Sequence, residues 1–456
     1  MNGNSTLAVK VGPGGDQVVA HVGLHALGCL ADRLGLGDAL SSTMPPTGER
    51  APLHDRGKVL VQTMLMLAGG GESCADIEHL RCQGLLFGPV PSDSTVYRTF
   101  RRIDPATLAD LWAAIAQVRA RVWDRSSSTS GADRVVLDVD ASLVEIHSEQ
   151  KAGTAATYKG GFGFHPIFCF ADATGEALGV LLRPGNATAN NAADNLAVVD
   201  AAVAQLPAGI ALGHLVGDNP SLVARPVMVR SDSAGCTAGF VGGCRSRNIG
   251  FAVVARTNAS IQAAISACVT DVDRWQPALR QDGTTHPASE VAEVTDLADL
   301  SAWPAGTRLI IRREPLHQGA QTSLFPSWEN RYWGHYTDQA GEPATLDAHM
   351  RAHAHVEDNI RRLKSSGLER FPFSDLHANR AWLANLCWAD SLVRWFQQLV
   401  LSGPLAVAEP KQLRWALWHT PARIVRKARR HIVRIVEGWP TAPQLLAAYQ
   451  RLDRIA

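Results

Sequence analysis

Apolar residues recur at helical spacing through most of the first 125 residues. The pattern runs through 20–40, 58–68 and 105–123, and Pro105 stands where it favours a first helical turn. The polar stretch 124–134 is rich in Ser and Gly and is typical of a linker. The sequence therefore predicts a mostly helical N-terminal region that ends near residue 130.

One further helix in this region is basic. The segment 92–104 begins with residues that cap helices and continues with Arg98, Arg101 and Arg102. A short helix with arginine on one face can enter a DNA groove, and the same pattern fits a solvated helix surface equally well. Both interpretations stay open at this point.

The pattern changes to strands after the linker. Turn residues separate short apolar runs, and the order that follows is three strands, a helix, a strand, a helix and a strand. The expected strands lie within 135–147, 165–172, 175–185, 226–235 and 251–257, with the first helix in 190–207. This is the element order of the ribonuclease H-like fold, an α/β fold whose mixed sheet carries acidic residues at strand ends.

The alternation breaks at residue 258, and helical spacing resumes near 345. Between these points the chain contains candidate strands such as 307–315. We therefore expect a core that is interrupted by a β-rich insertion. The expected parts are a helical DNA-binding region (1–130), the first part of the core (131–257), the insertion (258–345), the second part of the core (346–400) and a basic helical C-terminal region (401–456).

Composition narrows the class of protein. The 456 residues are 46% hydrophobic and 19% charged, as expected of a globular protein with a sizeable core. No apolar run reaches the roughly 18 residues that cross a bilayer, and the N-terminus lacks the features of a secretion signal. The eight cysteines include no Cys-x-x-Cys pair, which argues against disulfides and structural zinc. We expect a cytoplasmic protein without a membrane span.

Charge is distributed unevenly along the chain. The formal net charge is only +1, yet residues 401–456 contain ten Lys or Arg against three acids. The segment 423–434 is the densest, with six basic residues and no acid. Read as a helix, it places five of them on one face: Arg423, Arg426, Lys427, Arg430 and Arg434. Such a face would neutralise DNA phosphates, although a solubilising surface is the alternative.

Three acidic residues are candidates for a metal site. Asp140 lies in the first core strand, Asp232 lies at the end of the fourth, and Glu357 lies on a later helix. Three carboxylates can hold two Mg²⁺ ions about 3.5–4 Å apart, an arrangement that cleaves phosphodiesters. Oxygen ligands suit Mg²⁺ or Mn²⁺ and not zinc.

Each of these acids also has an ordinary structural interpretation. Asp often follows a buried strand as a turn residue, and Glu357 with Arg361 has the spacing of a helical ion pair. The first position is ambiguous as well, because strand alternation puts Asp138 and Asp140 on the same face. Both could approach the metals.

Several longer motifs resemble one family. The chain is similar, from about 20 to 440, to the DDE transposases of bacterial insertion sequences, specifically insertion-sequence family 1380. The motifs are YKGGFGFHP (158–166), LLRPGNATANNAADN (181–195), VRSDSAG (229–235), HAHVEDNIRRLK (353–364) and SGLERFP (366–372). The resemblance implies a ribonuclease H-like core with a β-rich insertion, Mg²⁺-dependent cleavage at inverted terminal repeats, and strand transfer into target DNA.

The resemblance also implies roles for individual residues. It implies that Asp140, Asp232 and Glu357 are the three catalytic acids. Related transposases carry Tyr, Arg, Glu and Lys in a helical array, of which this chain matches only Glu357 and Lys364, with Met350 and His353 in the other places. Phosphate binding near Glu357 is then expected from Arg361 or Lys364.

Two further motifs have alternative interpretations. The glycines and Lys159 of 158–166 could approach phosphate closely, or the glycines could form a tight hairpin. Trp328 and Trp333 could stack on an extruded base, or pack the core of the insertion.

Together these features predict a cut-and-paste DNA transposase. We expect it to bind the terminal inverted repeats and target DNA as a homodimer, in association with the nucleoid. The alternatives are a DNA-binding protein with this fold that no longer cuts, and a nuclease without strand transfer.

Overall fold

The computed structural model describes residues 17–44, 53–126, 133–316, 330–427 and 430–455. The first 125 residues form mainly helices, as the apolar spacing predicts. They are α1 (Val22–Arg33), α2 (Leu36–Thr43), α3 (Arg56–Ala68), α4 (Glu78–Arg81), α5 (Gly84–Phe87), α6 (Asp93–Arg101) and α7 (Pro105–Arg125), preceded by the short strand β1 (Val18–Val19). Helix α7 begins at Pro105, and the Asp104 side chain accepts a hydrogen bond from the Thr107 amide at 2.7 Å.

A nine-stranded mixed sheet forms the centre of the molecule. Its strands, in spatial order, are β10 (Gln276–Leu279), β11 (Thr285–Glu293), β12 (Arg308–Pro315), β13 (Asn330–Thr337), β9 (Ile249–Val254), β8 (Val227–Ser231), β2 (Val135–Ala141), β6 (Ile167–Ala171) and β7 (Ala177–Leu181). Strands β2, β8 and β9 are parallel, and β6 and β7 are antiparallel. The predicted element order from 135 to 257 is confirmed, with α9 (Ala192–Val203) and α11 (Ala238–Arg245) as its helices.

The segment expected to be a β-rich insertion supplies strands β10 to β13. These strands are antiparallel and extend the central sheet, because β13 pairs with β9. Helix α12 (Ala259–Cys268) accompanies them. Strands β10–β13 thus form one continuous sheet with β9, β8, β2, β6 and β7.

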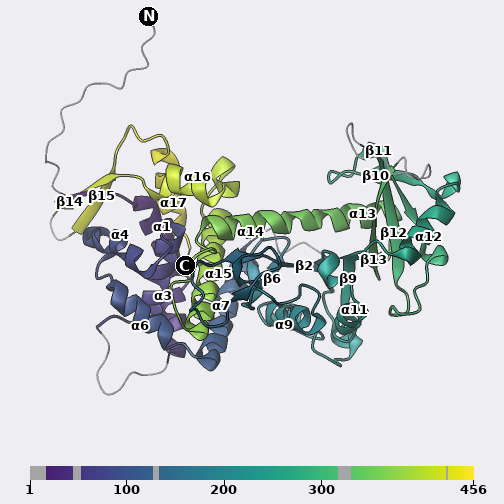
Figure 1. The fold of residues 1–456 in the computed structure, drawn as a ribbon. Coiled ribbons are helices and arrows are strands. Elements are labelled where there is room, and N and C mark those ends of the chain that lie inside the picture. The colour runs from purple at the N-terminus through teal and green to yellow at the C-terminus, as the bar shows by residue number, and fades with distance from the viewer. Residues whose placement is uncertain (1–16, 45–52, 127–132, 317–329, 428–429, 456) are drawn as a thin grey trace, which may run out of the picture.

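Helices return at residue 343, as predicted. Figure 1 shows α13 (Pro343–Arg351) and α14 (His355–Ser365) following one another as a rod from strands β10–β13 to the rest of the molecule. A 3₁₀ turn, Ala352–Ala354, joins them. The rod ends against α15 (Leu376–Leu399), a long helix whose Trp382, Trp388 and Trp395 are buried. None of the helices in the described part of the chain combines the length and apolar composition needed to cross a bilayer.

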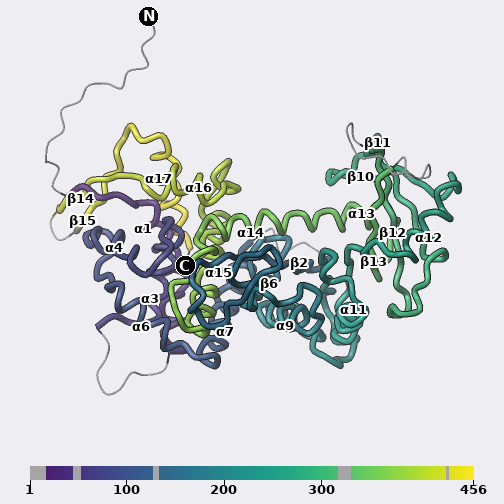
Figure 2. The backbone as a smooth tube through the Cα atoms, viewed as in Figure 1, coloured from purple at the N-terminus to yellow at the C-terminus, as the bar shows by residue number. Residues whose placement is uncertain are grey.

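The C-terminal region differs from the prediction. The basic segment 423–434 was expected to be a helix, and this expectation is wrong: β14 (Ala422–Lys427) and β15 (Arg430–Ile435) form an antiparallel hairpin. Strand β1 pairs with β14, so Figure 2 shows this small sheet beside the N-terminal helices. Helices α16 (Pro410–Leu413) and α17 (Ala442–Leu452) flank the hairpin in the sequence.

The hairpin forms because the segment is rich in β-branched residues and buries apolar side chains on one face. Ala422 and Ile424 are buried on one face, whereas Arg423 and Lys427 are exposed. β-branched side chains favour strands, and the period of two buries them on one side. The helical interpretation considered the spacing of the arginines and missed this alternation.

Candidate active site

The three predicted acids come from three separate elements at one side of the central sheet. Asp140 lies near the end of β2, and Asp232 follows β8, the parallel neighbour of β2. Glu357 lies in the first turn of α14 and is exposed. The carboxyl ends of neighbouring parallel strands meet at one edge of a sheet, and α14 carries the third acid to that edge.

Electrostatics place the three carboxylates in one neighbourhood. Burial raises the pKa of Asp140 to about 6, and the negative charges of Asp232 and Glu357 contribute to the rise. Local hydrogen bonds orient two of the acids, since Asp140 accepts from the Ala141 amide at 2.7 Å and Asp232 accepts from the Ala234 amide at 2.8 Å. Asp232 is therefore a turn residue as well as a member of the cluster.

The donor set suits a hard cation by its chemistry. Carboxylate oxygens are the ligands that Mg²⁺ and Mn²⁺ prefer, and a cation would relieve the repulsion felt by Asp140. Within the described residues, however, no three His, Cys, Asp or Glu side chains are close enough together to hold a metal ion as they stand. Coordination therefore requires a closer approach of the side chains.

Asp138 has a different environment from Asp140. Its two carboxylate oxygens accept hydrogen bonds from Arg230 at 2.8 and 2.7 Å, and His353 Nδ1 lies 2.7 Å from Oδ1. Although burial opposes it, these hydrogen bonds from His353 and Arg230 lower the pKa of Asp138. Both oxygens are occupied by protein groups, so Asp138 positions neighbouring elements.

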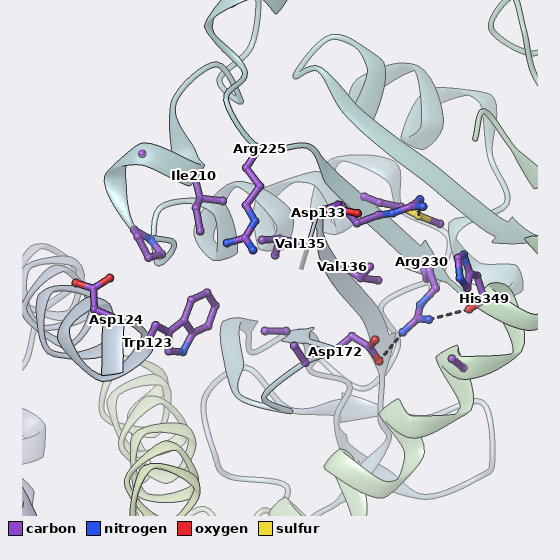
Figure 3. Close-up of a pocket in the computed structure, with 17 residues that line it drawn as sticks. Trp123, Asp124, Asp133, Val135, Val136, Asp172, Ile210, Arg225, Arg230 and His349 are labelled. Carbon is purple, nitrogen blue, oxygen red and sulfur yellow. Dashed lines mark hydrogen bonds and ion pairs between the residues drawn. The ribbon is translucent and has the colours of Figure 1, made fainter. Parts of the chain in front are cut away.

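Arg230 is a functional candidate that the sequence interpretation missed. Besides Asp138, it contacts Asp172 at 2.6 Å and donates to the His349 carbonyl at 2.7 Å, as Figure 3 shows. It thereby ties β8 to β2, to the turn after β6 and to the helical rod that carries Glu357. A charged residue inside a buried strand was the available signal, because such a residue requires a buried partner.

A cavity of about 600 Å³ adjoins this network. It lies at the beginning of β2 and β8, where Val135, Val136 and Met228 line it, and Arg230 reaches it from the network. Asp140, Asp232 and Glu357 do not line the cavity. The cavity and the acid cluster therefore lie at different ends of the same two strands.

The two basic candidates that follow Glu357 lie on the same helix. Arg361 is exposed and forms ion pairs with Asp358 at 2.7 Å and with Glu409 at 3.4 Å. Lys364 is half-buried in the last turn. Arg361 must therefore exchange protein carboxylates for phosphate if it binds DNA.

The glycine-rich loop forms a small sheet. Strands β3 (Val144–Glu145), β5 (Phe162–Phe164) and β4 (Ala155–Ala156) lie in that order, and the turn between β4 and β5 contains Gly160 with a φ of 84°. A side chain at Gly163 would meet the Val144 carbonyl oxygen at 2.0 Å. These contacts favour the hairpin interpretation of the glycines. Lys159 is exposed beside Tyr158.

The remaining predicted residues lie away from the acids along the chain. Trp333 is partly exposed on β13 under the Arg331 guanidinium, which lies 4.5 Å from the ring centroid, and Trp328 falls outside the described residues. The basic residues of the C-terminal segment lie on the hairpin: Arg423, Arg426, Lys427, Arg430 and Arg434. Arg423 and Arg434 are direct cross-strand partners, whereas Arg426 belongs to the opposite face.

Comparisons with known proteins show the family of the chain. The family model described as "Transposase DDE domain group 1" matches residues 2–456. Among solved structures, the chain is similar to a piggyBac transposase in a synaptic complex with hairpin DNA, with 9% identity, a TM-score of 0.42, and coverage of 87% of this chain and 80% of that one. No match was found among curated protein sequences.

Proposed function

Because the chain belongs to the transposase DDE domain group 1 family, we propose that it is a DNA transposase of the insertion-sequence family 1380 type. It would cleave at transposon inverted-repeat ends and transfer the 3′-hydroxyl strands to target DNA. The observation that carries this proposal is the meeting of Asp140, Asp232 and Glu357 in one electrostatic neighbourhood, although they are distant in sequence. Such acids are the groups that phosphodiester cleavage requires.

We further propose that the core is ribonuclease H-like. The sheet order β7-β6-β2-β8-β9, with β6 antiparallel to a parallel β2-β8-β9 set, supports this assignment. The core would be interrupted by the β10–β13 segment and completed by α14. This arrangement explains why Glu357 arrives so late in the sequence.

The site would work with Mg²⁺, for which Mn²⁺ can substitute. Asp140, Asp232 and Glu357 would hold the metal, which when bound supplies activation of an attacking hydroxyl and stabilisation of the leaving oxygen. The Ala141 and Ala234 amides hold Asp140 and Asp232 in place. The Asp138–Arg230–His353 network fixes the beginning of the helical segment that carries Glu357.

DNA would be held by positive charge outside the acid cluster. The proposed contacts are Lys159, Arg361, Lys364, Trp333, Trp328 and the basic residues of the β14–β15 hairpin. The exposed Arg423 and Arg434 are the strongest of these by position, because they are paired across the strands and, among the described residues, neither has an acid as its strand partner. Since an element has two ends, we propose a homodimer as the active assembly.

The Asp232→Asn variant tests the proposed chemistry. We expect it to bind terminal-repeat DNA like the wild type and to lose metal-dependent cleavage by more than about 100-fold, since even outer-shell changes at metal sites cost 10–100-fold. The matched control is Asp110→Asn, which removes one exposed carboxylate from α7 and should retain activity. Gel analysis of end-labelled DNA with Mg²⁺ measures both cleavage and joining.

Three outcomes of this assay decide between the candidates. Joined products from the wild type support a transposase, and cleaved ends without joining indicate a nuclease. Binding without any metal-dependent cleavage would indicate a protein that no longer cuts. Equal activity of Asp232→Asn and the wild type would contradict the proposed site.

A further inference from the structure

A second cavity, of about 450 Å³, lies among the N-terminal helices. Four arginines line it, together with the hydroxyl groups of Ser92 and Thr95. They are Arg56, Arg81, Arg98 and Arg102. No carboxylate is among the described residues that line this cavity. We call these four residues and the two hydroxyls the arginine pocket.

Three helices build the arginine pocket. Arg56 is the first residue of α3, Arg81 is the last residue of α4, and Arg98 and Arg102 lie at the end of α6 and just after it. Figure 1 shows α6 at the edge of the N-terminal helices, away from the rod of α13 and α14. The pocket is therefore separate from the acid cluster and the 600 Å³ cavity.

Arg81 pairs with Glu78 at 3.0 Å, whereas the other three pocket arginines have no ion-pair partner in the part of the chain that the structure describes. Neighbouring Arg101 pairs with Asp375 at 2.7 Å. Burial lowers the pKa of Arg56, and the positive charge of Arg102 lowers it further. The negative charge of Asp55 offsets part of this effect, and an external anion would compensate the remaining repulsion between the arginines.

The available groups define the chemistry of that anion. Guanidinium groups and hydroxyls donate hydrogen bonds, and the planar fork of arginine matches the oxygens of a phosphate. Among the described residues that line the pocket, His54 supplies the one ring, and no Phe, Tyr or Trp side chain is present to stack on a base. We propose that the arginine pocket binds backbone phosphates of double-stranded DNA, independently of base sequence. This inference deepens the proposed function, because it places one DNA contact of the transposase in the N-terminal helices.

The test is a DNA-binding measurement on the full chain with EDTA present. Fluorescence anisotropy with a labelled duplex of mixed sequence is recorded at several salt concentrations. The variant combines Arg56→Gln, Arg98→Gln and Arg102→Gln. Each lost phosphate contact lowers the magnitude of the slope of log affinity against log salt by about 1, so we expect a decrease of about 3 and an affinity loss on the order of tenfold or more at low salt.

A matched variant controls for the loss of positive charge. It combines Arg33→Gln, Arg101→Gln and Arg121→Gln in the same helical region, where each arginine already has a protein partner: Asp453, Asp375 and the Leu34 carbonyl. We expect its salt slope to stay near that of the wild type. Replacement of the three pocket arginines by Lys, which keeps the charge, should restore most of the slope.

Protein folding is checked by thermal unfolding of each variant. If the triple variant does not fold, Arg98→Gln alone serves, because this side chain is exposed and should lower the slope by about 1. An unchanged slope in the pocket variants, an equal loss in the control triple, or a wild type that does not bind duplex DNA overturns the inference. The inference is also overturned if inorganic phosphate stabilises the wild type but not the pocket variants, while both bind DNA with the same affinity.

The binding assay contains no metal, so it separates this inference from the proposed chemistry. Slope loss in a protein that never cleaves DNA would support the arginine pocket and contradict the transposase activity. If cleavage depends on Asp232 but the three arginines have no effect on DNA binding, the transposase activity is supported and the arginine pocket is contradicted.

Discussion

Burial and neighbouring negative charge both raise the pKa of Asp140. Its carboxyl group is removed from water and lies near two further acids, which raises its pKa to about 6 from an ordinary value of 3.8. A raised pKa in the folded state means that this group stabilises the protein below about pH 4. The contribution is lost as the pH rises through about 6. At neutral pH, metal-free protein therefore keeps an unfavourable charge at this position.

This shift makes the effect of Mg²⁺ depend on pH. We expect Mg²⁺ to raise the melting temperature clearly at pH 8 and much less at pH 5, because a proton on Asp140 competes with the cation. In the absence of metal, Asp140→Asn should be more stable than the wild type at pH 8, by on the order of 1–2 kcal/mol after allowance for partial exposure, and about equal at pH 4. Thermal unfolding with and without Mg²⁺ measures both effects. An equal Mg²⁺ effect at the two pH values would refute the assignment.

The alternation of residues along one strand does not decide the role of Asp138. Its alternation with Asp140 correctly puts both residues on one face, yet one joins the acid cluster and the other is bound by Arg230 and His353. The partners come from β8 and from the turn before α14, far away in the sequence. Local periodicity carries no information on such pairing, so the division of roles required the fold.

At the scale of elements, helices and strands were predicted correctly where the apolar residues followed a single period. The helices of the first 125 residues and the strand-helix order of the core follow the apolar spacing closely. The prediction for the C-terminal segment was wrong because its basic residues have a helical spacing, whereas the buried Ala422 and Ile424 have the period of two of a strand. Burial of Ala422 and Ile424 against the N-terminal helices decided the outcome, and that contact is not visible locally.

The hairpin geometry makes a prediction that differs from the helical one. Arg423 and Arg434 face each other across the strands, so their Gln substitutions should affect DNA affinity in a coupled way, by about 0.5 kcal/mol or more in a double-mutant cycle. Arg423 and Arg426 lie on opposite faces, and their effects should be additive. Anisotropy titrations of the single and double variants measure both cycles. Coupling between Arg423 and Arg426 alone would contradict the strand arrangement.

At the scale of the whole molecule, one buried carboxylate connects distant regions. Glu176, just before β7, accepts hydrogen bonds from Arg119 at 2.8 Å, Trp123 at 2.7 Å and Trp395 at 2.9 Å. These partners belong to α7 and α15, so the sheet, the N-terminal helices and the long helix α15 meet at this group. Arg119 and Glu176 are both fully buried.

Removal of this carboxylate should destabilise the entire protein. Glu176→Ala leaves the Arg119 charge buried without its partner, so we expect a loss of about 3–5 kcal/mol in the free energy of unfolding. The exposed control, Glu149→Ala, should stay within about 0.5 kcal/mol of the wild type. Urea unfolding followed by tryptophan fluorescence gives both values. A change in Glu176→Ala as small as that in the control would show that this connection is unimportant.

The pairing of β1 with β14 has a consequence for how the molecule is made. Val18 and Val19 are translated first, and their partners Arg423 and Ala422 follow only after the whole intervening segment 20–421 has been synthesised. Until then the strand has an open edge, and α1 lacks the backbone hydrogen bond that Val22 donates to Thr420. Translation that stops before residue 422 would therefore yield polypeptides whose first helices are left without this cover and are open to proteolysis.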